Sequence, residues 1–174
     1  MQKKAALTVR EMVLFAMLGA LMFISKIIME WIPNVHLLGM FIMTFTIVYR
    51  KKALWPIYVF VLISGLAYGF TPWWYAYLYI WTVLWAVTML LPKSMPRKMA
   101  RPVYMAVCAL HGFAFGALWA PLQALQYGFG FSATLAWIAA GFPMDVVHGI
   151  GNFFAGILIL PLADVLIKLE KRKF

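Results

Sequence analysis

The side chains most able to do chemistry in this sequence are polar groups embedded in long apolar stretches. Asp145, His148 and Asn152 recur at helical spacing, so they fall within roughly 60° of one another on one helix face. Lys26 and Glu30 stand four residues apart in another apolar stretch. Ionisable groups in such surroundings are costly to keep and mark binding sites by default. The chemistry they offer is hydrogen bonding and charge recognition of a small solute.

Each of these groups also has a purely structural explanation. Lys26 and Glu30 either form a local ion pair along one helix face or line an outward-open cavity. The face that carries Asp145 either bonds to a neighbouring helix or forms a ligand wall, and Gly149 and Gly156 on the same face allow close approach in both cases. We favour the wall, because an aspartate near the outer end of a helix gains nothing from lipid and the helix N-terminus stabilises its ionised form.

Aromatic and amide side chains extend the candidate site. Tyr77 and Trp81 lie where an aromatic ligand would stack, although packing and the interfacial aromatic belt also produce such stripes. The single Cys108 excludes an intramolecular disulfide and argues against a thiolate metal site. We expect no catalytic residue, no metal and no cofactor. The predicted substrate-binding residues are Lys26, Glu30, Asn34, His36, Tyr77, Trp81, Trp119, Gln123, Trp137, Asp145, His148 and Asn152.

The elements that must position these side chains are membrane-spanning helices. Hydrophobic residues make up 66% of the chain and charged residues 11%, whereas a soluble domain is about a quarter charged. A hydrocarbon core about 30 Å thick needs roughly 20 apolar residues of helix. The sequence therefore predicts an all-α, polytopic membrane protein formed by one domain, residues 1–174. Its six transmembrane helices are expected near residues 12–31, 35–49, 53–69, 74–91, 102–125 and 143–167.

Residues 131–142 are left over and are too short to span. We expect them to form an outer capping segment, re-entrant or interfacial, between the fifth and sixth helices. Pro143 suits the first turn of the helix that follows. Irregular backbone at membrane depth must be buried in protein or line a cavity, so this segment is the first pointer to a binding site.

The basic residues, which give a net charge of +10, predict the topology. All of them except Lys26 lie before the first predicted span, between the second and third, between the fourth and fifth, or after the sixth. The positive-inside rule places these segments, and both termini, in the cytoplasm. The charge is thus a topology signal and a contact for anionic lipid rather than a nucleic-acid site.

Under this topology the candidate polar groups lie in the outer half of the membrane, and His111 is the exception. This asymmetry suits capture of a solute from outside and does not suit a continuous channel, which needs polar lining throughout. Two patterns of small residues, Ala16 with Ala20 and Gly112 with Gly116, favour close helix contacts. Packing within the chain is an alternative explanation for both.

Over nearly its whole length the sequence resembles the substrate-binding S components of energy-coupling factor (ECF) vitamin transporters. The shared features are small size, six spans, basic inner loops and the Ala16 and Ala20 pair. The stretch from Pro143 to Pro161, with its Asp, His and Asn residues and a closing Leu160-Pro161, is similar to the last helix of that family.

The resemblance implies a subunit of a prokaryotic plasma membrane that captures a vitamin-like heterocyclic micronutrient near the outer face. It also implies that Ala16 and Ala20 contact a transmembrane coupling subunit and that two partner ATPase subunits supply energy. The chain has no Gly-xxxx-Gly-Lys-Ser/Thr loop with which to hydrolyse ATP itself.

Other functions stay open from the residues alone. A solitary secondary transporter is the main alternative, although the chain shows no internal repeat. An intramembrane enzyme would use Ser64 with His111 or His148 as nucleophile and base. A haem-binding subunit would use the same two histidines, at different depths.

Overall fold

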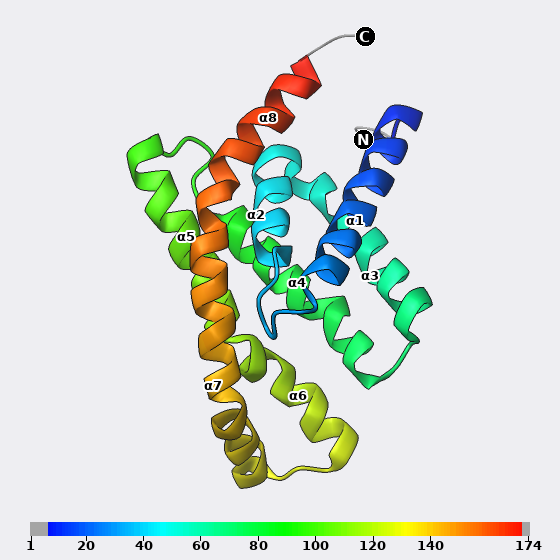
Figure 1. Cartoon of the computed structure of the whole chain (residues 1–174), viewed down its shortest axis with the longest axis vertical. Helices are drawn as coiled ribbons and strands as arrows, with labels where there is room; N and C mark the ends of the chain where they lie inside the picture. Colours follow the sequence, from blue (N-terminus) through cyan, green and yellow to red (C-terminus); the bar gives the residue numbers. More distant parts are fainter. Residues whose placement is uncertain (1–6, 172–174) are drawn as a thin grey trace, which may run out of the picture.

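Helices and the loops that join them make up residues 7–171, the part that the computed structural model describes, and this part contains no strand (Figure 1). This confirms the all-α prediction. The helices are α1 Val9–Met29, α2 Leu38–Tyr49, α3 Leu54–Tyr68, α4 Pro72–Leu90, α5 Arg97–Phe113, α6 Phe115–Tyr127, α7 Phe131–Ala155 and α8 Ile159–Lys171, with short 3-10 turns η1 Arg50–Ala53 and η2 Gly156–Leu158.

Three helical stretches are long and apolar enough to cross a membrane. They are α1, the pair α5–α6 over Arg97–Tyr127, and the run α7–η2–α8 over Phe131–Lys171. The last of these has 41 residues. At 1.5 Å per residue it is roughly 60 Å long, about twice the hydrocarbon thickness of a bilayer.

Helix α2 is the centre of the fold. Every residue from Leu38 to Thr46 is buried, and α2 packs mainly against α4 and α8. Two of its residues are threonines, whose hydroxyls donate to the carbonyls of Met40 and Ile42 one turn earlier, at 2.8 and 2.6 Å. All polar side chains of this buried segment are therefore satisfied inside the helix.

The break predicted between residues 131–142 and the last helix is wrong. These residues form the first half of α7, which continues unbroken through Pro143 to Ala155. The turn lies before them, at Gly128 with φ 66° and at Gly130, which is the N-cap of α7. Pro143 removes one backbone hydrogen bond, but the helix continues past it.

The fifth predicted span, residues 102–125, is two helices. Helix α5 ends at Phe113, α6 begins at Phe115, and Ala114 joins them. As Figure 1 shows, α6 and the first half of α7 form a hairpin that projects beyond the other helices. Its side chains are largely exposed, with Leu125 at 84% and Phe131 at 81%.

Ion pairs tie several basic segments together at one end of the molecule. Glu11 in the first turn of α1 pairs with Lys52 of η1, and Arg97 at the start of α5 pairs with Asp164 of α8. Helix α1 begins and α8 ends at this same end, at the top of Figure 1. We call it the basic end.

Glycines set the closest helix contacts. A Cβ on Gly19 of α1 would meet Val59 Cγ1 at 2.5 Å and the Pro56 carbonyl oxygen at 2.9 Å, so α1 and α3 cross at this residue. Ala16, one turn earlier on α1, is exposed. Of the small residues in this stretch of α1, Gly19 rather than Ala16 makes the contact within the chain.

We predict that Gly19→Leu lowers the free energy of unfolding by about 1–3 kcal/mol, because the new side chain cannot fit between α1 and α3. Ala16→Leu is the matched control and should leave stability unchanged. Thermal unfolding followed by tryptophan fluorescence in detergent measures both. Equal melting temperatures for the two variants would contradict the assigned α1–α3 contact.

Candidate functional site

A cavity of about 230 Å³ lies where the connection between α1 and α2 meets α4, α6 and α7. It contains most of the polar side chains expected from the sequence. The residues that line it are Lys26, Met29, Glu30, Ile32, Pro33, Asn34, Val35, His36, Tyr77, Phe115, Trp119 and His148.

The wall of this cavity includes irregular backbone. After α1 ends, the chain makes two tight turns, closed by hydrogen bonds from Ile32 N to Met29 O and from Val35 N to Ile32 O. Asn34 adopts φ 56°, a left-handed conformation that asparagine tolerates better than most residues. The expected link between irregular backbone and a cavity therefore applies to this loop rather than to residues 131–142.

Two imidazole rings, those of His36 and His148, pack edge to face in the wall of the cavity. The rings of His36 and His148 lie 4.5 Å apart between centroids, at an interplanar angle of 71°. His36 Nδ1 and His148 Nε2 are buried, and neither makes a hydrogen bond within the described part of the chain. Desolvation lowers the pKa of His36 below its ordinary value, so this ring is neutral. Unpaired buried nitrogens are costly, which makes both histidines candidate ligand-binding residues.

Aromatic rings support the two histidines. Phe115 lies 4.8 Å from His148, and Trp81 lies 6.0 Å from His36, between ring centroids. Trp119 stands next to Phe115, with its Nε1 buried and unbonded in the described chain. An indole N–H only donates, so a ligand seated here needs an acceptor atom facing Trp119.

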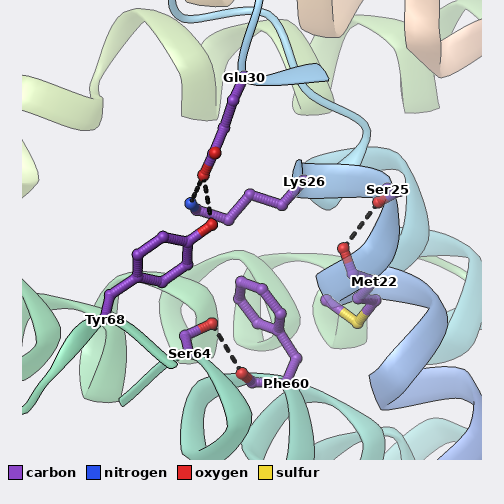
Figure 2. Close-up of polar contacts among 7 residues, drawn as sticks. All are labelled: Met22, Ser25, Lys26, Glu30, Phe60, Ser64 and Tyr68. Carbon is purple, nitrogen blue, oxygen red and sulfur yellow. Dashed lines mark hydrogen bonds and ion pairs between the residues drawn. The ribbon is translucent and has the colours of Figure 1, made fainter. Parts of the chain in front are cut away.

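The rim of the cavity carries a charged network, shown in Figure 2. Lys26 Nζ lies 2.7 Å from Glu30 Oε1, and the Tyr68 hydroxyl donates to the same oxygen at 2.6 Å. The ammonium also sits 4.3 Å from the centre of the Tyr68 ring. Hydrogen bonds from Lys26 and then Tyr68 lower the pKa of Glu30. The local ion pair considered from the sequence thus exists, and both partners also line the cavity.

Asp145 lies outside the lining and has a different partner. The backbone N–H of Gly116 donates to both carboxylate oxygens, at 3.0 and 3.1 Å. A Cβ on Gly116 would collide with the carboxylate, so the glycine is what allows this contact. Asp145 therefore holds the first turn of α6 against α7, where the helix dipole favours a negative charge.

Asn152 also connects helices. Its Nδ2 donates to the Cys108 carbonyl of α5 at 3.2 Å, beside the close crossing of Gly112 and Gly149. His148 is the one member of the trio Asp145, His148 and Asn152 that lines the cavity.

The remaining predicted residues lie farther away. Trp81 is fully buried behind Tyr77, with ring centroids 5.2 Å apart. Gln123 and Trp137 are partly buried in the projecting hairpin and do not line the cavity. Of the interface pair, Ala16 is exposed and Ala20 is partly buried on the same side of α1.

Phe115 and the apolar residues of the loop between α1 and α2 line the cavity but were not predicted from the sequence. Phe115 precedes Trp119 by four residues, a helical spacing that was available as a signal. Ile32, Pro33 and Val35 gave no signal, because their place in the wall depends on how the loop turns inward.

Two residues considered for other chemistry, Ser64 and His111, have hydrogen-bond partners within the chain. The Ser64 hydroxyl is buried and donates to the Phe60 carbonyl at 2.8 Å (Figure 2), and His111 Nε2 bonds the Ile80 carbonyl at 3.1 Å. Within residues 7–171, no group of three or more His, Cys, Asp or Glu side chains is placed to hold a metal ion.

Comparison of the chain with protein-family models, with curated proteins and with solved structures finds no match. The function is therefore inferred from the sequence and from the geometry of the cavity.

We predict that Asp145→Ala destabilises the protein by about 1–3 kcal/mol, since it leaves the buried Gly116 N–H without a partner. Thermal unfolding in detergent measures the loss. The control is Gln123→Ala on the exposed hairpin, which should leave the melting temperature unchanged. A stable Asp145→Ala variant would show that this contact does not hold α6 in place.

Proposed function

We propose that this chain is the substrate-capturing membrane subunit of an ECF-type importer. It binds a vitamin-like heterocyclic micronutrient at the extracellular side and delivers it inward with a coupling subunit and two ATPase subunits. The observation that carries the proposal is a cavity lined by His36, His148 and Trp119, each of which has a buried ring nitrogen without a hydrogen bond in the described part of the chain.

The chemistry of the cavity favours a small planar ligand. Phe115, Tyr77 and the rings behind them supply flat apolar walls, while Trp119 supplies a donor. A neutral imidazole donates from one nitrogen and accepts at the other, so the histidines match either kind of ring substituent. The ionised groups of the rim, Lys26 and Glu30, already neutralise each other.

The proposed topology has six crossings with both termini in the cytoplasm of a prokaryotic cell. The crossings are α1, α2, α3, α4, the pair α5–α6, and the run α7–α8. Helix α2 is about 18 Å long by its 12 residues, shorter than a bilayer core, but protein rather than lipid surrounds it. The ion pairs of the basic end support a common cytoplasmic level for its charged segments.

The exposed face of α1 around Ala16 suits contact with the coupling subunit. Ala16 is exposed between Val13 and Met17, which are 55% and 66% exposed, so a helix can approach the α1 backbone closely there. Because Gly19 already makes the contact with α3, packing within the chain does not use Ala16.

The ligand site is tested by His148→Phe, which keeps a ring of similar size and removes both nitrogens. We expect wild-type protein purified from rich medium to retain a small molecule in native mass spectrometry, and the variant to retain at least tenfold less. Gln123→Leu, outside the cavity, should retain it as wild type does. If His148→Phe retains the small molecule at the wild-type level, the assigned ligand site is wrong.

The partner face is tested by Ala16→Trp in cells that also produce ECF coupling and ATPase subunits. We expect co-purification with the coupling subunit and uptake to fall at least tenfold, because the indole blocks helix approach, while ligand retention stays unchanged. Ala117→Trp, an exposed alanine on α6, is the matched control. Uptake without those partner subunits would favour a solitary secondary transporter instead.

A further inference from the structure

A second cavity, of about 220 Å³, lies at the other end of α2 from His36. It opens at the basic end, between η1, the last turn of α4 and helix α5. Its polar lining comes from Arg50, Thr88, Lys93 and Tyr104, and its apolar lining includes Ile47 and Leu91. Neither the capture of a micronutrient nor the coupling face uses these residues.

Arg50 has an unusual backbone conformation and two hydrogen bonds to α4. Its backbone adopts φ 53°, a left-handed conformation that a long side chain rarely takes unless its surroundings impose it. Trp85 Nε1 donates to the Arg50 carbonyl at 3.1 Å, and Arg50 Nη2 donates to the Met89 carbonyl at 2.9 Å. The guanidinium is therefore preorganised at the cavity wall.

The positive charge of this cavity lacks a counter-charge. Arg50 Nε is buried and makes no hydrogen bond to the described chain. Two acidic residues of this end are engaged elsewhere, Glu11 with Lys52 and Asp164 with Arg97. No carboxylate lines the cavity, and Lys93 has no ion pair within residues 7–171.

We propose that this cavity binds a phosphate group. The planar guanidinium of Arg50 matches two phosphate oxygens, and Lys93 adds a second positive charge. The Tyr104 hydroxyl offers a neutral donor from α5. The phosphate comes either from the headgroup of an anionic phospholipid in the leaflet at the basic end, where basic residues attract such lipids, or from soluble phosphate.

The lipid source is tested by native mass spectrometry of the full-length protein in detergent with phosphatidylglycerol or phosphatidylcholine added. We expect wild type to retain one phosphatidylglycerol and no phosphatidylcholine, and Arg50→Gln to bind phosphatidylglycerol at least tenfold more weakly. Lys51→Gln is the matched control, because Lys51 is the exposed neighbour outside the cavity. It should bind as wild type does.

Lys93→Gln is the second variant, because Lys93 has no ion pair whose loss would unfold the protein, whereas Arg50 also supports the end of α4. It should weaken phosphatidylglycerol binding at least threefold with an unchanged melting temperature.

Soluble phosphate is tested by its effect on the melting temperature. If inorganic phosphate stabilises wild type but not Arg50→Gln, and displaces phosphatidylglycerol, the phosphate site stands and its ligand is soluble. The proposal is overturned if wild type binds neither probe, if both cavity variants bind as wild type does, or if Lys51→Gln loses as much as Arg50→Gln.

Discussion

The fold depends on the burial of α2, a helix whose 12 residues are shorter than the hydrocarbon core of a bilayer. From Leu38 to Thr46 every side chain of α2 faces protein, so the other helices must surround it. Irregular backbone therefore flanks α2 at both ends. It is the loop before Leu38 at one end and, at the other, Arg50, which begins η1 with a positive φ. Each of these ends adjoins a cavity with unbonded polar atoms. Both candidate sites thus follow from one shortened helix.

Close contacts at glycines set the distance between helices α5 and α7 beside the cavity that His148 lines. Gly112 and Gly149 let α5 and α7 cross almost backbone to backbone, and Gly156 lies against the Cα of Met105. This crossing brings His148 of α7 to the loop residue His36. A side chain larger than hydrogen at Gly112 or Gly149 would push α7 outward and separate the two imidazoles.

The sequence predicted the helical class and most of the polar residues at the cavity beside His148, because apolar runs and their few polar interruptions are local patterns. It failed at the boundary between residues 131–142 and the helix that follows, because a proline does not end every helix and α7 continues through Pro143. It grouped Asp145 with His148 by angle on one helix, but the partner of Asp145, Gly116, comes from a helix break that no local pattern marked. Such partners are set by tertiary contacts, which local sequence patterns do not predict.

Helices α7 and α8, joined by η2 without a loop, connect the cavity residue His148 to the basic end. His148 stands 20 residues before Lys168, a lever arm of roughly 30 Å along one helical axis. A tilt of about 5° around His148 displaces the far end of that arm by about 2–3 Å, comparable to half a helical turn. The Arg97–Asp164 ion pair lies near that end and links the arm to α5. A change in the tilt of α7 at the cavity would therefore also move α8 and, through this ion pair, the start of α5 at the basic end.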